Sequence, residues 1–135
     1  MLRLQRLWTV LSVIMMTVSL WIAVKPMDAE QDSWLSWLQV LLVSDKGEHA
    51  FAFFVYGLWF GALVGPSKWR RVALLVFLYG ALIELLQALL PTGRSADLMD
   101  LLADCAGLVL GLLAATWFGR RWLLRVDGWV AARGG

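Results

Sequence analysis

The sequence has 135 residues, of which 61% are hydrophobic and only 16% are charged, and its net charge is +2. Soluble domains of this length carry roughly 25% charged residues, so this composition excludes a soluble globule, a disordered chain, a coiled coil and a basic nucleic-acid-binding protein. It predicts an all-α integral membrane protein with a single domain over residues 1–135. The only cysteine, Cys105, excludes an intrachain disulfide and a multi-cysteine zinc site.

Four apolar segments are long enough to cross a membrane, because a helical span takes about 17–25 mostly apolar residues. They are residues 7–24, 49–64, 72–90 and 101–118. The first segment is longer than the apolar part of a signal peptide, and no small-residue cleavage pattern follows it, which predicts a retained helix. The sequence therefore predicts a bundle of four transmembrane helices.

Basic residues are distributed unevenly between the two sides of this bundle. The two tails and the loop between the second and third spans hold nine lysines and arginines together, and the other two loops hold three. Short loops rich in lysine and arginine stay in the cytoplasm. Both termini are therefore predicted to be cytoplasmic, and a bacterial inner membrane is the expected location.

Two segments outside the spans have the composition of chain that lies on a membrane surface. Tryptophan and leucine recur at helical spacing over residues 33–43, which predicts a short interfacial helix in the first extracytoplasmic loop. Residues 119–135 combine arginines with Trp122, Leu123 and Leu124. That combination predicts a basic interfacial tail on the cytoplasmic side, held by anionic lipid head groups.

Polar side chains in and beside the last three spans gather toward one face of the membrane in this topology. They are Asp45, His49, Glu84, Gln87, Arg94, Asp97, Asp100 and Asp104. Within each span the polar residues are three or four apart, a spacing that puts them on one helix face. We therefore expect them to line one polar pocket that opens to the outside of the cell.

Glycines continue the same helix faces and predict close packing. The glycines expected at helix contacts are Gly57, Gly61, Gly80, Gly107 and Gly111. Small residues at a spacing of four let two helix backbones approach each other closely in a membrane. The polar faces are therefore expected to point into the bundle rather than toward lipid.

Glu84 is the most deeply placed of the polar residues. It precedes Pro91 by seven residues, which is about 10 Å at the rise of an α-helix. An ionised carboxylate at mid-membrane costs about 2.5–3.5 kcal/mol. Glu84 is therefore expected to be protonated, to be paired, or to face a wet cavity, and His49 and Arg94 are the candidate partners.

The residue types in the predicted pocket suggest separate roles. Glu84, His49 and Asp100 are the candidate catalytic residues, because an acid and a base in one pocket can transfer protons. Arg94 is expected to hold a phosphate or carboxylate group through two hydrogen bonds. The other candidate ligand-binding residues are Asp45, Gln87, Asp97 and Asp104. No metal site is predicted, since one histidine with carboxylates is a weak zinc signal, and the cofactor, if any, is unknown.

The same residues form a pattern that resembles the VanZ-like family. The matching segments are DKGEH at 45–49, ELLQ at 84–87, Gly93 and Arg94 with Asp97 and Asp100, and ADCAG at 103–107. They occur in the order of the family over about residues 45–112. The family usually has asparagine where this chain has Asp104. Asparagine can donate a hydrogen bond whereas ionised aspartate only accepts, so the role of position 104 stays open.

The resemblance implies a small multi-span protein of the bacterial envelope, in a family whose namesake is associated with resistance to the glycopeptide antibiotic teicoplanin. It leaves open whether a reaction is catalysed. The first hypothesis is a pocket that binds, and in one version modifies, an anionic envelope lipid or a cell-wall precursor.

Two other hypotheses remain. The second is a non-catalytic scaffold or accessory subunit in which the polar residues are structural. The third is proton-coupled transport, which four spans without an inverted repeat support less. The lipid bilayer is the expected partner in every case, nucleic acid is not, and a homo-oligomer is allowed.

Overall fold

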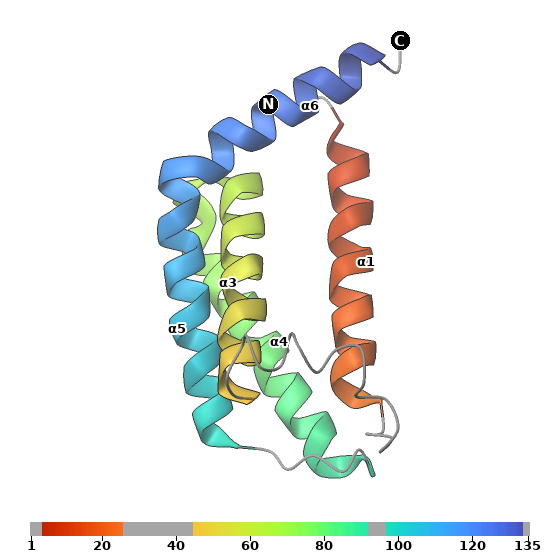
Figure 1. Ribbon diagram of the computed structural model, residues 1–135, viewed down its shortest axis with the longest axis vertical. Coiled ribbons are helices and arrows are strands. Elements are labelled where there is room, and N and C mark those ends of the chain that lie inside the picture. The colour runs from red at the N-terminus through yellow and green to blue at the C-terminus, as the bar shows by residue number, and fades with distance from the viewer. Residues whose placement is uncertain (1–3, 26–44, 92–96, 134–135) are drawn as a thin grey trace.

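The computed structural model describes residues 4–25, 45–91 and 97–133, and every regular element in these ranges is helical (Figure 1). In chain order the elements are α1 (Gln5–Val24), α3 (Asp45–Val64), a 3₁₀ turn (Pro66–Lys68), α4 (Trp69–Leu89), α5 (Leu98–Ala114), a π-helical turn (Ala115–Gly119) and α6 (Arg120–Arg133). Four helical runs among them are long and apolar enough to cross a membrane. The predicted all-α protein with four spans is confirmed.

The helices extend beyond the apolar segments that predicted them. α3 begins at Asp45 rather than at residue 49, and α5 begins at Leu98 rather than at residue 101. The fourth run continues to Arg133, so most of the predicted tail over residues 119–135 is helical. Hydropathy marks the part of a helix that matches the apolar core of the membrane, and it therefore misses the polar turns at either end. The interfacial helix predicted over residues 33–43 lies outside the described residues.

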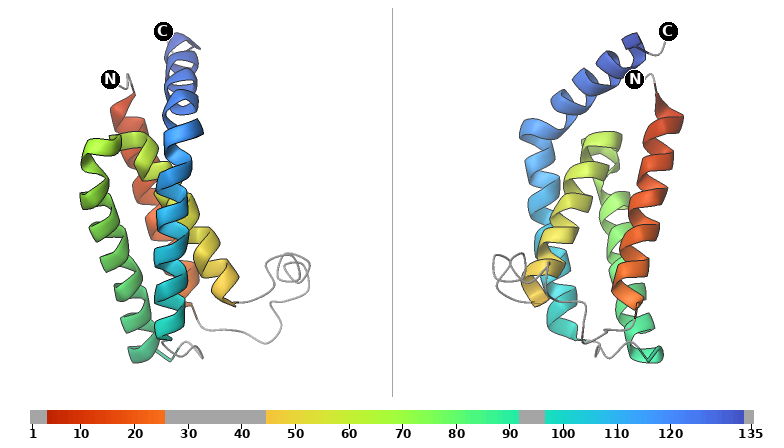
Figure 2. Two further views of the ribbon diagram at one scale, coloured as in Figure 1. Left: turned by 90° about the vertical axis from the view of Figure 1, so that its left-hand side faces the viewer. Right: turned by 45° about the vertical axis from the view of Figure 1, so that its right-hand side comes forward.

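α3 and α5 form the most extensive helix contact of the bundle (Figure 2). A Cβ atom added at Gly107 would overlap the carbonyl oxygen of Ala50, and one added at Gly111 would overlap that of Phe54. Gly57 faces the backbone of α5 in the same way from the other helix. Small residues permit such close approach, so these glycines fix how α3 and α5 lie against each other and where their polar ends meet.

α1 lies at the edge of the bundle and is held there by hydrogen bonds. Trp8 is the one buried residue of α1, and apolar side chains such as Val13 are exposed. The Tyr79 hydroxyl of α4 donates a hydrogen bond to Met16 O at 2.8 Å. Because lipid tails are as apolar as the helix side chains, hydrophobic burial does little to drive helix association. Hydrogen bonds of this kind therefore orient α1.

α6 leans across the end of the bundle toward the start of α1, after the π-helical turn (Figure 1). Asp127 of α6 is 2% exposed, and its Oδ1 accepts hydrogen bonds from Leu4 N (3.0 Å) and Trp8 Nε1 (2.7 Å). Leu123 packs with Trp8 beside these bonds. Asp127 thus joins α6 to α1, a contact between the two ends of the described chain.

Replacing Asp127 by alanine is expected to loosen α6 from α1. The substitution removes the acceptor of the Leu4 N–H and the Trp8 indole N–H, and a hydrogen bond to a charged group contributes about 1.5–3 kcal/mol. We expect a loss of stability of about 2–3 kcal/mol, measured as a lower melting temperature in detergent. Asp127→Asn, which keeps an acceptor oxygen, is the matched control and should lose less. An alanine variant as stable as the unchanged protein would show that Asp127 does not hold α6.

Candidate functional site

Polar residues gather at the end of the bundle opposite to the start of α1 and the end of α6. The start of α3, the end of α4 and the start of α5 meet there (Figure 1). We use the name polar cluster for Lys46, His49, Glu84, Asp97, Asp100 and Asp104. Three helices therefore contribute to one site, and the α3–α5 glycine contact sets the distance between two of them.

His49 and Asp104 join α3 to α5 inside the polar cluster. His49 Nδ1 lies 3.0 Å from Asp104 Oδ1, and the two side chains are 12% and 3% exposed. A Cβ atom at Gly80 of α4 would come within 2.9 Å of Asp104 Oδ2. Glycine at position 80 therefore leaves room for a carboxylate between α4 and α5. This carboxylate orients the imidazole ring, since the partner of one ring nitrogen decides what the other can do.

Glu84 faces the N-terminus of α5 from α4. Its Oε2 accepts a hydrogen bond from the backbone N–H of Asp97 at 2.9 Å. Its Oε1 is buried and has no hydrogen-bond partner among the residues that the structure describes. Buried polar atoms are nearly always hydrogen-bonded, and Glu84 is only 9% exposed. The unpaired Oε1 atom therefore indicates that Glu84 is protonated or binds a ligand.

Asp97 caps α5 and pairs with Lys46 at the rim of the polar cluster. Asp97 Oδ1 accepts a hydrogen bond from Met99 N at 2.8 Å, as an N-cap aspartate does. Lys46 Nζ lies 2.6 Å from Asp97 Oδ2 and 3.0 Å from Asp100 Oδ1. The hydrogen bond from Lys46, together with that from Met99, holds the pKa of the Asp97 carboxyl below its ordinary value. Lys46 and Asp97 are both exposed by more than two fifths, so they mark the open side of the polar cluster.

The three candidate catalytic residues come together from three helices. His49 of α3, Glu84 of α4 and Asp100 of α5 each offer one nitrogen or oxygen atom, and these atoms lie within 4.8 Å of one another. Asp100 is 4% exposed. An imidazole and two carboxylates at this distance can share protons with each other or with a bound molecule.

The remaining candidate ligand-binding residues are placed differently. Gln87 is buried, and its Nε2 donates a hydrogen bond to Ala23 O of α1 at 3.0 Å, which accounts for its burial without a ligand. Asp45 is the first residue of α3. Arg94 lies outside the described residues.

Two residues of structural importance are not among the predicted site residues. Lys46 is predicted only as a loop residue, yet it lies in the first turn of α3 and pairs with two aspartates of α5. Its position beside the other charged residues of the DKGEH segment is the signal that could have revealed it. Asp127 also carries a signal, because it is the only acid in the basic segment 119–135.

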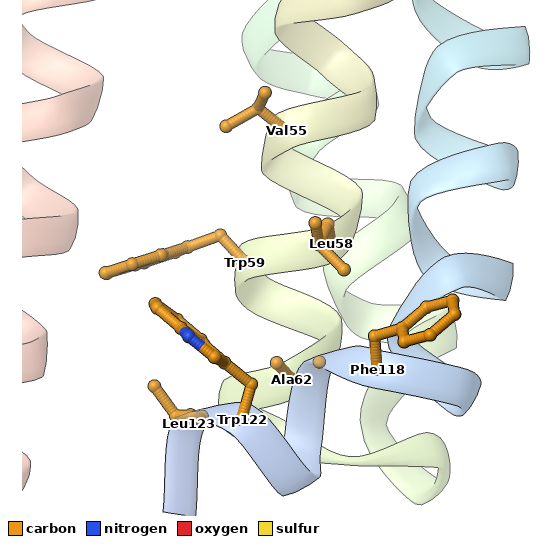
Figure 3. Close-up of a pocket in the computed structure, with 8 residues that line it drawn as sticks. Val55, Leu58, Trp59, Ala62, Phe118, Trp122 and Leu123 are labelled. Carbon is orange, nitrogen blue, oxygen red and sulfur yellow. The ribbon is translucent and has the colours of Figure 1, made fainter. Parts of the chain in front are cut away.

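A cavity of about 240 Å³ lies toward the other end of the bundle, beside the π-helical turn (Figure 3). It is lined by Val55, Leu58, Trp59, Ala62, Phe118, Gly119, Trp122 and Leu123. These residues supply neither an acid nor a base nor a cation. The polar cluster is therefore the candidate functional site.

A comparison with known protein families identifies a family that matches most of the chain. The family described as VanZ/LLP1 matches residues 4–119 of the chain. This range contains the whole polar cluster and all four spans as far as the π-helical turn. No curated protein and no solved structure matches the chain.

Proposed function

From the premise that this chain belongs to the VanZ/LLP1 family and is a multi-pass membrane protein, we propose that its polar cluster binds the anionic head group of an envelope lipid or a cell-wall precursor. The bound molecule would enter from the outer face of a bacterial inner membrane. The cellular context of the proposal is resistance to glycopeptide antibiotics of the teicoplanin type.

The buried Glu84 carboxylate is the observation that carries this proposal. An ionisable residue inside a span indicates a functional site by default, because the bilayer makes it costly. Glu84 is 9% exposed and its Oε1 has no hydrogen-bond partner among the described residues. A purely structural acid would be expected to have both oxygens satisfied.

The arrangement of the polar cluster supports a division of roles. Lys46, at the open side, and Arg94 would attract the head group by charge. Glu84 and His49, one acid and one base in the same buried space, would exchange protons with it. Asp104 would keep the His49 ring in place through the 3.0 Å contact at Nδ1.

The distribution of basic residues supports the proposed orientation. Nine lysines and arginines lie in the two tails and the loop between the second and third spans, against three in the other loops. By the positive-inside rule the termini then face the cytoplasm. The polar cluster, at the opposite end of the bundle (Figure 1), would face the cell wall and the lipid precursors assembled there.

A structural role for the polar cluster is the alternative, and specific contacts favour it. Lys46 already pairs with Asp97 and Asp100, His49 with Asp104, and Gln87 binds the backbone of α1. In a membrane, such interhelical bonds hold helices together. The chain would then act as a scaffold or an accessory subunit, with no bound head group.

Glu84→Gln and His49→Ala distinguish these two functions. Each variant is expressed in a host that lacks the protein, and both teicoplanin susceptibility and the melting temperature in detergent are measured. For head-group binding we expect both variants to lose protection and to carry less co-purified anionic lipid. Glu84→Gln should melt close to the unchanged protein, whereas His49→Ala should melt lower because it removes the partner of the buried Asp104 Oδ1. Asp127→Asn, at the other end of the bundle, is the control for a general loss of stability.

Two results would contradict head-group binding. Protection that is unchanged in both variants would exclude a role for Glu84 and His49. Loss of protein level and melting temperature by Glu84→Gln, in parallel with its loss of protection, would favour the scaffold.

A further inference from the structure

Three side chains of types that bind metal ions converge in the polar cluster. The nearest suitable atoms of His49, Glu84 and Asp100 lie within 4.8 Å of one another. A Zn²⁺ ion holds nitrogen and carboxylate oxygen at about 2.0–2.2 Å, so two of its ligand atoms are at most about 4.4 Å apart. Small rotations of the carboxylates would therefore bring all three residues onto one ion.

The second observation is the buried Oε1 atom of Glu84, which has no hydrogen-bond partner among the described residues. Glu84 is only 9% exposed, and an isolated ionised carboxylate in an apolar environment is very costly. A cation bound to Glu84 would satisfy this oxygen. This observation is independent of the spacing of the three ligand-type groups.

Each of the three residues also contacts a neighbouring residue that holds its side chain in place, as is common for metal ligands. His49 Nδ1 is 3.0 Å from Asp104 Oδ1, so in the proposed site the ion would bind to Nε2. Glu84 Oε2 accepts the N–H of Asp97 at 2.9 Å, and Asp100 Oδ1 is 3.0 Å from Lys46 Nζ. Carboxylate–histidine–metal arrangements of this kind fix the ring tautomer and orientation.

The charges of the polar cluster favour a divalent ion. Among its residues, all of which the structure describes, the polar cluster contains four carboxylates, those of Glu84, Asp97, Asp100 and Asp104, and one lysine, Lys46, which pairs with Asp97 and Asp100. With all five groups ionised and His49 neutral, the sum is one minus four, or three negative charges. A divalent cation would compensate two of these charges, and three of the carboxylates, those of Glu84, Asp100 and Asp104, are buried, where water compensates little.

We propose that His49, Glu84 and Asp100 bind a divalent transition-metal ion, Zn²⁺ or Mn²⁺, with Asp104 as the residue that positions His49. One imidazole nitrogen favours such ions over Mg²⁺ and Ca²⁺, which prefer oxygen ligands alone. The ion would leave coordination positions open and would add positive charge beside Lys46. The ion would therefore add to this acidic site the positive charge that attracts an anionic head group.

Titration of the purified protein with the metal alone tests this inference. The full chain, in detergent, with its affinity tag removed and after treatment with EDTA, is titrated with Zn²⁺ or Mn²⁺ by calorimetry. We expect one saturable site per chain and a higher melting temperature with the ion bound. Mg²⁺ at the same concentration should bind at least about tenfold more weakly.

Variants locate the site. Glu84→Gln and Asp100→Asn keep the size of the side chain, and each should weaken metal binding more than Asp104→Asn does. Asp104 is only a hydrogen-bond partner of a metal ligand, and changing such a residue weakens metal binding by about 10–100-fold or less. Asp127→Asn, a buried acid at the other end of the bundle, and Cys105→Ser should bind like the unchanged protein. The fold of each variant is checked by circular dichroism and gel filtration. If one of the two ligand variants does not fold, the other decides.

Two results would overturn the metal site. One is the absence of saturable Zn²⁺ or Mn²⁺ binding by the folded protein. The other is an affinity that Glu84→Gln and Asp100→Asn leave unchanged. Because no lipid is present in this titration, its failure would leave head-group binding by Lys46 and Arg94 untouched, and the two proposals can fail separately.

Discussion

A Gly107→Ala variant is expected to be less stable than the unchanged protein by about 1–3 kcal/mol, because overpacking a tight contact costs that much. The added methyl group would overlap the carbonyl oxygen of Ala50 on α3. That oxygen belongs to a helix backbone and cannot rotate away. Either α3 and α5 move apart, or the protein does not assemble. Thermal unfolding in detergent, followed by circular dichroism, measures the loss.

Gly128→Ala is the matched control for this substitution. Gly128 lies in α6, where an added Cβ would meet nothing within 4 Å. Alanine favours a helix over glycine by up to about 1 kcal/mol, so this variant should be as stable as the unchanged protein or slightly more so. Equal melting temperatures for Gly107→Ala and Gly128→Ala would contradict a close α3–α5 contact at Gly107.

Replacing Asp104 by leucine is the second change with a large expected effect. Asp104 is 2% exposed and is the partner of His49 Nδ1. Leucine would leave that nitrogen without this partner, and an unsatisfied buried group costs about 1–3 kcal/mol. We expect a loss of that size in detergent. The metal ion proposed for His49 should bind more weakly as well, since the imidazole ring would no longer be oriented.

Asp104→Asn should be tolerated where Asp104→Leu is not. The asparagine Oδ1 atom can accept a hydrogen bond from His49 Nδ1, and the side chain has the same size. Asparagine is also the residue that the resembled family usually has at this position. We expect a stability within about 1 kcal/mol of the unchanged protein. An asparagine variant that is as unstable as the leucine variant would show that the negative charge, rather than the hydrogen bond, holds His49.

The sequence was sufficient to predict the four spans, because a run of apolar residues reports directly on the apolar core of a membrane. It was less informative at the helix ends. The first turn of α3 contains Asp45, Lys46 and Glu48, which lower the local hydropathy without interrupting the helix. In the fourth run, a π-helical turn carries the helix into the basic segment as far as Arg133, and hydropathy contains no sign of such a turn.

The residues of the candidate site could be predicted from the sequence, but the contacts between them could be predicted less well. The topology of the four spans indicated that His49, Glu84 and Asp100 lie near the same end of the bundle. It could not indicate that Asp104 would pair with His49, because that pairing depends on how closely α3 and α5 pack. Gln87 shows the same limit, since its bond to Ala23 of α1 joins helices far apart in the sequence.

The acidic character of the polar cluster links the two proposals made above. The four carboxylates of the polar cluster would weaken the attraction of Lys46 and Arg94 for an anionic head group. A bound divalent cation would reduce the local charge from three negative to one negative and could contact a phosphate directly, as metal ions do in many phosphate sites. Head-group binding is therefore expected to increase when Zn²⁺ or Mn²⁺ is present, which binding of a labelled anionic lipid to the detergent-solubilised protein would measure. Equal lipid binding with and without the ion would show that head-group binding does not depend on the metal ion.

Thiol labelling in intact cells determines the side of the membrane on which the polar cluster opens. In a Cys105→Ser background, Pro91→Cys introduces a thiol just after α4, at the end of the bundle that holds the polar cluster, and Ser67→Cys introduces one in the turn between α3 and α4 at the opposite end. We expect a membrane-impermeant maleimide to label the Pro91→Cys variant in intact cells, and the Ser67→Cys variant only after the cells are permeabilised. The reverse pattern would place the polar cluster in the cytoplasm and would contradict the proposed binding of an outward-facing head group.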